Sequence, residues 1–96
     1  MFERGLSMNY DENSNVLKAL AHPLRLKMIH MLIKNECCVT DVTNSLGISQ
    51  STSSQHLIIL KNAGVVFPKK YGTKTCYIVN NEIAKRIIHI LEEETK

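Results

Sequence analysis

A predicted tight turn between two short helical segments is the feature that most restricts the fold of this chain. The pattern predicts a brief helix from Thr40 to Leu46, and Gly47 suits the left-handed backbone that ends such a helix. Ser49 is a good N-cap for a second helix, which Gly64 closes. Two helices joined by so short a turn predict a helix-turn-helix.

Two β-rich runs follow this pair of helices. Residues 65–67 and 75–79 are rich in β-branched and aromatic side chains, and a lysine-rich turn around Gly72 separates them, so the pattern predicts a hairpin. Pro68 indicates that the first strand lies at an edge or ends early. A helix-turn-helix followed by a hairpin is typical of a winged helix-turn-helix.

Further helices flank this unit on both sides. Two precede it, the second beginning at Pro23, and a last helix follows with Asn80 or Asn81 as its cap. The expected fold is therefore mainly α with a small β-hairpin wing, in the order helix-helix-helix-helix-strand-strand-helix. We expect residues 13–94 to form one domain, preceded by a flexible N-terminal arm of residues 1–12.

The composition fits one globular domain. The 96 residues are 44% hydrophobic and 22% charged, enough for a core that needs no disulfide or metal. The sequence has no run of about 18 apolar residues and no signal-peptide pattern, so no membrane partner is expected. Three cysteines cannot all pair within one chain, and the expected location is cytoplasmic. The absence of a glycine-rich phosphate loop and of a Ser-His-Asp or Cys-His grouping argues against an enzyme.

The distribution of charge says more than the formal net charge of +3. From Val42 to Asn81 the chain contains no Asp or Glu, while four lysines fall inside this stretch, Lys61, Lys69, Lys70 and Lys74. Nearly half of the chain therefore lacks the charge that would repel phosphate, as expected of a nucleic-acid surface. A merely polar face is the alternative.

The predicted helix after Ser49 begins with two turns that carry no apolar side chain, residues 49–55. A helix that only covered a core would show its apolar stripe from the first turn. Short hydroxyls and amides suit the major groove of DNA, which recognition helices contact through their N-terminal residues. A solvated polar helix end is the alternative interpretation.

Lysines at the hairpin turn complete the expected surface for double-stranded DNA. They could straddle phosphates beside a groove, or only protect the hairpin edge from aggregation. The expected DNA contacts are Gln50, Ser51, Thr52, Ser54, Gln55, Lys69, Lys70 and Lys74. A winged helix used only for protein–protein assembly is a competing interpretation, and it predicts an apolar or acidic face in this place.

The last helix is apolar over most of its circumference, with five Ile or Leu residues from Ile83 to Leu91. A small monomer could not bury this face together with that of the first helix, so we expect the two helices to pair across the two-fold axis of a homodimer. The expected dimer contacts are Val16, Leu17, Leu20, Ile83, Ile87, Ile88 and Leu91.

Two stretches carry a likeness to a known family. Residues 17–29 read Leu-Lys-Ala-Leu-Ala-His-Pro-Leu-Arg-Leu-Lys-Met-Ile, and residues 46–66 run from Leu-Gly-Ile-Ser-Gln to Ala-Gly-Val-Val. Together with the wing, they resemble the opening and the helix-turn-helix of the ArsR/SmtB family of bacterial metal- and thiol-sensing repressors. The resemblance implies a homodimeric repressor that binds a palindromic operator and leaves the DNA when an effector binds.

The resemblance also bears on single residues of the second helix of this motif. It places the family's major-groove contacts on Gln50, Ser51, Ser54 and Gln55, and it implies that His56 packs the helix rather than reading bases. Ser53 departs from the family, in which Val is usual, and its hydroxyl is expected to loosen the packing of the recognition helix.

The cysteines match the family's sensing pattern only in part. Its best-known thiolate box reads Glu-Leu-Cys-Val-Cys-Asp-Leu, where residues 36–42 here read Glu-Cys-Cys-Val-Thr-Asp-Val. Cys38 matches the first box cysteine, but Thr40 replaces the second, which breaks the spacing used for arsenic, lead or cadmium; Cys37 is an added neighbour. The family's zinc, cobalt or nickel site needs Asp and His pairs on the last helix, which offers one imidazole, His89.

A winged helix often pairs the segment before its helix-turn-helix with the second wing strand. Cys37 or Cys38 would then lie beside Cys76, and three thiols would suit a thiophilic metal or metalloid ion such as arsenite or copper(I). Two thiols could instead form a disulfide or polysulfide bridge, with Cys76 as the less strained partner. The alternative is that the cysteines are buried core residues and that no cofactor or effector exists.

Overall fold

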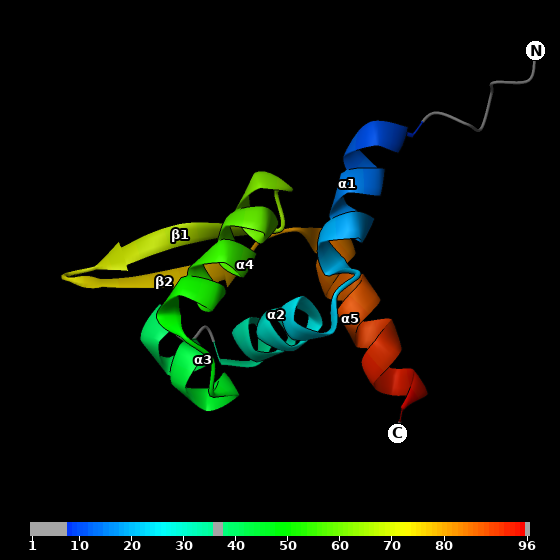
Figure 1. The fold of residues 1–96 in the computed structure, drawn as a ribbon. Coiled ribbons are helices and arrows are strands. Elements are labelled where there is room, and N and C mark those ends of the chain that lie inside the picture. Colours follow the sequence, from blue (N-terminus) through cyan, green and yellow to red (C-terminus); the bar gives the residue numbers. More distant parts are fainter. Residues whose placement is uncertain (1–7, 36–37, 96) are drawn as a thin grey trace, which may run out of the picture.

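The structure is a computed structural model that describes residues 8–35 and 38–95. Within these residues it contains five helices and a two-stranded antiparallel sheet, shown in Figure 1. In chain order the elements are α1 (Tyr10–Leu20), α2 (Pro23–Asn35), α3 (Val39–Leu46), α4 (Gln50–Asn62), β1 (Val66–Tyr71), β2 (Lys74–Val79) and α5 (Glu82–Glu94). The expected fold, mainly α with a hairpin wing, is confirmed. None of these helices is both long and apolar enough to cross a membrane.

Two helices begin earlier than the sequence pattern indicates. Helix α1 begins at Tyr10, because the Asn9 side chain caps it by accepting a hydrogen bond from the Glu12 amide at 2.9 Å. The last three residues of the expected arm are therefore helical, and residues 1–7 lie outside the described residues. Helix α3 has Cys38, not Thr40, at its N-cap position, and no side-chain hydrogen bond caps it.

The turn of the helix-turn-helix has the backbone that the sequence predicts. Gly47 is left-handed with φ 65°, and the next amide, that of Ile48, donates to the Thr43 carbonyl at 3.3 Å. Ser49 then caps α4 by accepting from the Thr52 amide at 3.1 Å. These contacts fix the direction in which α4 leaves α3.

The hairpin is longer than expected. Its register runs from Val66 opposite Val79 to Tyr71 opposite Lys74, so β1 continues through Pro68 instead of ending there. Strand β1 is an outer strand, where a missing amide proton is tolerated. On its other side β2 pairs through one isolated bridge, between Cys76 and Cys38.

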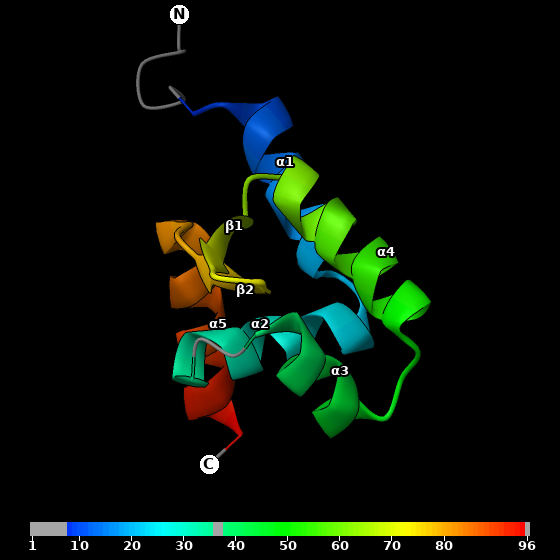
Figure 2. The same ribbon diagram turned by 90° about the vertical axis from the view of Figure 1, so that its left-hand side faces the viewer.

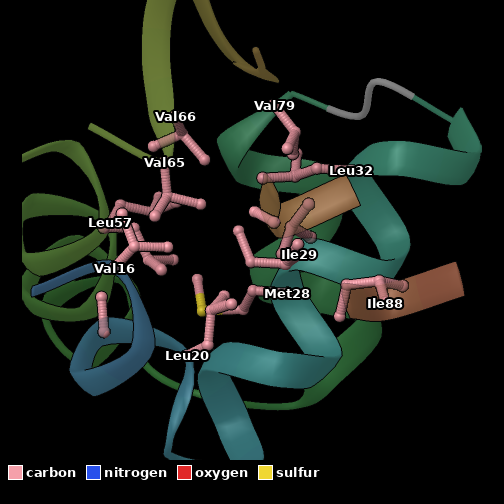
Figure 3. Packing of buried hydrophobic residues seen from close by; sticks show 14 residues of the cluster. Val16, Leu20, Met28, Ile29, Leu32, Leu57, Val65, Val66, Val79 and Ile88 are labelled. Atoms are coloured by element: carbon pink, nitrogen blue, oxygen red, sulfur yellow. The ribbon is translucent and has the colours of Figure 1, made fainter. Parts of the chain in front are cut away.

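The core lies around α2, whose Met28, Ile29 and Leu32 are almost fully buried (Figure 3). Residues from each of the other helices and from both strands pack against it. Val16 and Leu20 of α1 and Ile88 of α5 belong to this core. The single chain thus already buries three of the seven residues expected to contact a second chain, because they lie on the inner sides of their helices.

A charged cluster joins α2 to α5. The Glu92 carboxylate accepts hydrogen bonds from His30 Nε2 and Lys34 Nζ, both at 3.0 Å. These two bonds, that from His30 first, lower the pKa of Glu92 to about 2 from its usual 4.5. The cluster holds the C-terminal half of α5 against the end of α2.

The Glu92 cluster predicts a difference in acid sensitivity. Because the folded-state pKa of Glu92 is lowered, its carboxylate stabilises the fold above pH 4.5 and loses this effect as the pH falls toward 2. We expect the wild type to unfold at higher urea concentration than Glu92→Gln at pH 7, and the difference to disappear by about pH 2. The difference in midpoint should be small, since His30 is exposed and Glu92 partly exposed, and 1 M salt should reduce it further. A gap between the two midpoints that stays constant with pH would contradict the assignment.

Arg25 connects three helices. Its Nε donates to the Ala19 carbonyl at the end of α1 at 2.6 Å, and its Nη1 lies 3.3 Å from His56 Nδ1 on α4. Since a guanidinium can only donate, this ring nitrogen of His56 is the acceptor. Burial, followed by the charges of His22 and Arg25, lowers the pKa of His56 and keeps the ring neutral. His56 is half-buried and packs against His22 and Arg25, in line with the packing role that the family resemblance implies.

Candidate nucleic-acid interface

The N-terminal half of α4 presents a polar face to solvent. Gln50, Ser51, Ser54 and Gln55 are exposed, whereas Ser53 is buried and anchors the helix. Thr52 is half-buried, and its hydroxyl is hydrogen-bonded to Ser49 Oγ at 2.9 Å, so this residue serves the cap. Four of the five residues expected to contact DNA from α4 are thus free to do so.

The wing carries the other expected contacts. Lys69, Lys70 and Lys74 are exposed, and Lys69 Nζ lies 5.6 Å from the centroid of the Tyr71 ring. In Figure 1 the wing and the N-terminal end of α4 project on the side of the molecule opposite to α1 and α5. Figure 2 looks along the hairpin from its tip, with α3 and α4 beside it. The polar helix face and the lysine-bearing wing therefore belong to one side of the protein.

A groove of about 380 Å³ separates the wing from α3 and α4. Gln50, Ser54 and Ile58 line it from α4, at successive positions along one helix face. Ile58 is a large apolar side chain, 52% exposed, that the expected set of DNA contacts does not include. The groove places an apolar contact next to the polar ones, in a cleft between the two parts of the expected interface.

A buried hydrogen bond sets the packing of α4 on α3. Thr43 Oγ1 lies 2.8 Å from Ser53 Oγ, and it is also hydrogen-bonded to the Val39 carbonyl at 2.7 Å. Both side chains are buried, with Ser53 at 0% exposure. The expectation that a hydroxyl at Ser53 loosens this packing is therefore wrong, because Thr43 supplies its polar partner.

The Thr43–Ser53 pair predicts a measurable coupling. Thr43→Val should cost about 1–3 kcal/mol, since it leaves the buried Ser53 hydroxyl without a partner. In the Thr43→Val background, Ser53→Ala should lower the free energy of unfolding by less than it does in the wild type. A double-mutant cycle of urea unfolding should give a coupling energy of about 0.5–3 kcal/mol between the two residues. Additivity of the two single changes would show that the bond adds no net stability.

Two of the three cysteines, Cys38 and Cys76, lie opposite each other, and Cys38 borders the groove. Cys38 pairs with Cys76 of β2 across the isolated bridge. Cys76 is buried, whereas Cys38 is partly exposed and is one of the residues that line the groove. The hydrogen bond with Cys38, burial, and the nearby Cys38 and Asp41 raise the pKa of Cys76 to about 11. Cys76 is therefore a protonated thiol at neutral pH, and Cys38 is the thiol that solvent reaches.

The structure describes two of the three cysteines of the expected thiol cluster. Cys37 lies outside the described residues. Among residues 8–35 and 38–95 no three His, Cys, Asp or Glu side chains are grouped so that they could hold a metal ion. Two adjacent thiols fit a ligand that bridges two sulfur atoms.

The opposite side of the protein carries an exposed apolar surface on α1 and α5. Of the residues expected there, Leu17, Ile83 and Leu91 are exposed and Ile87 is half-buried. Ile90, at 58% exposure, belongs to the same surface, although the expected set of contacts omitted it. The spacing of seven between Ile83 and Ile90 would have indicated a shared helix face.

Comparison with known proteins agrees with this arrangement. Residues 22–66 match the model of a family described as bacterial regulatory protein, arsR family. The arsenical resistance operon repressor of Staphylococcus xylosus is 36% identical over 75 residues, which are 78% of this chain and 72% of that protein.

Two solved structures share the whole fold. HlyU from Vibrio cholerae, named a transcriptional activator, has a TM-score of 0.84 and 32% identity, covering 91% of this chain and 95% of that one. The homodimeric winged helix-turn-helix DNA-binding domain of Mb0332 from Mycobacterium bovis has a TM-score of 0.82 and 25% identity, covering 99% and 86%. The chain belongs to the arsR family of bacterial regulatory proteins, which are DNA-binding transcriptional regulators and not enzymes.

Proposed function

We propose that this protein is a repressor that binds a palindromic operator as a homodimer. The observation that carries the proposal is the division of its surface. The polar face of α4 and the lysines of the wing lie on one side, and the exposed apolar residues of α1 and α5 lie on the other. Helix α4 would enter the major groove and the wing would contact the phosphates beside it.

The apolar surface supplies the contact between two copies. Leu17, Ile83, Ile90 and Leu91 are large apolar side chains, each about half exposed in the single chain, and grouped exposed apolar residues mark interaction sites. Pairing across a two-fold axis covers this area and presents two α4 helices to half-sites about one helical turn apart. The homodimeric neighbour from M. bovis supports this assembly.

A salt titration of operator binding tests the proposal. The reduced protein should bind a duplex from its own upstream promoter, and log K should fall by about 0.9 per phosphate contacted as log salt rises. Lys70→Gln removes one phosphate contact per protomer and should lower this slope by about 2 for the dimer. Lys85→Gln, an exposed lysine on α5, is the matched control and should leave the slope unchanged. Binding that is insensitive to salt would favour a protein–protein module instead.

We further propose that a thiol-directed effector releases the DNA at the Cys38–Cys76 pair. The pairing of these two residues across the isolated bridge carries this part of the proposal. Trivalent arsenic would suit it, because arsenous acid forms two As–S bonds with two thiols and releases two water molecules. Copper(I) and reactive sulfur are the other soft reagents that such a pair would bind or react with. The reducing cytoplasm would keep both thiols free in the resting state.

Cys38→Ser tests the effector site. Arsenite, copper(I) or polysulfide should release the wild-type protein from operator DNA. The Cys38→Ser variant should stay bound to the DNA, because it lacks the accessible thiol. The measurement is fluorescence anisotropy of a labelled operator in reductant-free buffer. Cys37→Ser is the companion variant, and it shows whether a third thiol takes part. Release of Cys38→Ser at the wild-type effector concentration would remove Cys38 from the site.

A further inference from the structure

The accessible thiol and the expected DNA contacts open into the same groove. Cys38 lies on one wall, Gln50 and Ser54 line the α4 side, and Thr73 and Lys74 line the wing side. Cys76 is 5% exposed whereas Cys38 is partly exposed, so of the two thiols Cys38 is the one that a reagent from solvent can reach. The path to the thiol pair thus runs through the surface that would face the operator.

We propose that operator DNA and a thiol-reactive ligand exclude each other at Cys38, so that this cysteine is a modification site only in the DNA-free protein. This inference rests on the proposed function. A helix seated in the major groove with a wing beside it brings the sugar-phosphate backbone across the space between the two elements. That space here is the groove of about 380 Å³, which is of the size of a small ligand. A backbone seated there would cover Cys38, which lines this groove.

The proposal differs from a release mechanism that acts through a distant change of shape. If the ligand and the DNA compete for one groove, the effector captures protein that has already left the operator. Competition predicts two effects: bound DNA hinders the modification of Cys38, and a group attached to Cys38 weakens DNA binding.

The chemistry of the probe reaction is a simple substitution. The Cys38 thiolate attacks the methylene carbon of iodoacetamide, a C–S bond forms, iodide leaves, and the thiol proton goes to the buffer. The raised pKa of Cys76, together with its burial, keeps that thiol protonated and unreactive under the same conditions. Mass spectrometry of peptides then follows Cys38 alone, provided that Cys37 is replaced by Ser.

The test is DNA protection in the Cys37→Ser protein. Alkylation of Cys38 is timed without DNA, with saturating operator duplex and with a random duplex at the same concentration, while anisotropy reports the bound fraction. We expect operator to slow alkylation by about 5–150-fold, the usual range of such coupling, and the random duplex to have little effect. Glu94→Cys, added at the exposed end of α5, is the internal control and should be alkylated at one rate in all three samples.

The converse measurement uses protein alkylated before DNA is added. The Cys37→Ser protein carbamidomethylated at Cys38 should bind operator about 5–150-fold more weakly than the unmodified protein. Adding Cys38→Ala, which adds no bulk to the groove, should leave operator binding as it is in the unmodified Cys37→Ser protein. Operator that binds normally but leaves the alkylation rate of Cys38 unchanged would overturn this inference and leave the proposed function standing. Unmodified protein that binds no promoter DNA would overturn both.

Discussion

Gln50→Ala is expected to weaken operator binding by about 30-fold or more and to leave binding to random duplex unchanged. Gln50 is exposed at the first position of α4 and lines the groove beside the wing, where a recognition helix contacts base edges. A bidentate contact between Gln and adenine contributes about 1–3 kcal/mol of discrimination. A dimer uses the residue twice, so the loss is about 2–6 kcal/mol, and each 1.4 kcal/mol is tenfold in affinity.

The measurement is a pair of anisotropy titrations, on operator and on random duplex, at one fixed salt concentration. Asn62→Ala is the matched control, since Asn62 is an exposed amide at the other end of the same helix. An equal loss of affinity for both duplexes would mean that Gln50 contacts the backbone and not the bases. Unchanged affinity for both would remove Gln50 from the interface.

Leu60→Ala is expected to cost about 2–5 kcal/mol of the free energy of unfolding. Leu60 lies on the inner side of α4 at 0% exposure, in the cluster that also holds Met28 and Ile29 of α2. Truncation removes buried apolar area and leaves a cavity that the neighbouring helices fill only in part. Since domains of this kind are stable by about 5–15 kcal/mol, the change removes a large share of the total.

Urea unfolding at one protomer concentration measures the effect, because dimerisation makes the midpoint depend on concentration. Ile58→Ala is the matched control: Ile58 is on the same helix but 52% exposed, so its truncation should change stability by about 0.5 kcal/mol or less. If both variants lost the same stability, the packing of α4 against α2 would not be what holds the recognition helix in place.

Local signals in the sequence were sufficient for the order of elements. The capping hydrogen bonds at Gly47, Ser49 and Asn81 reach residues within five positions, so the turn and the helix caps could be predicted from neighbouring residues. The early start of α1 was missed because the apolar periodicity begins only at Val16, whereas the helix is nucleated by the polar Asn9 cap.

Contacts between distant segments were harder to predict. Helix α5, and α1 at Leu17, carry exposed apolar residues as well as buried ones, and the sequence does not state which of them face the core. Val16, Leu20 and Ile88 were therefore assigned to a second chain, although they pack inside the first. The bond between Thr43 and Ser53 links residues on two helices, and a comparison of Ser53 with a usual Val gives no sign of its partner.

The general pairing of a winged helix predicted that Cys37 or Cys38 would lie beside Cys76, and in the structure it is Cys38 that shares a bridge with Cys76. What the sequence did not indicate is that Cys38 opens into the groove beside Gln50 and Lys74. That relation depends on the angle between the hairpin and α4, which the tertiary packing sets. The roles of these residues in DNA and effector binding stay predictions.

The contacts of Arg25 bear on the length of DNA that this protein can recognise. One guanidinium holds the end of α1 and the interior side of α4 together. In the proposed dimer α1 lies near the two-fold axis, so the distance between the two reading helices has little freedom to vary. Inserting one base pair between the half-sites shifts one of them by about 3.4 Å and rotates it by roughly 35°. We therefore expect the regulator to tolerate changes of the central bases of its operator far better than any change in their number.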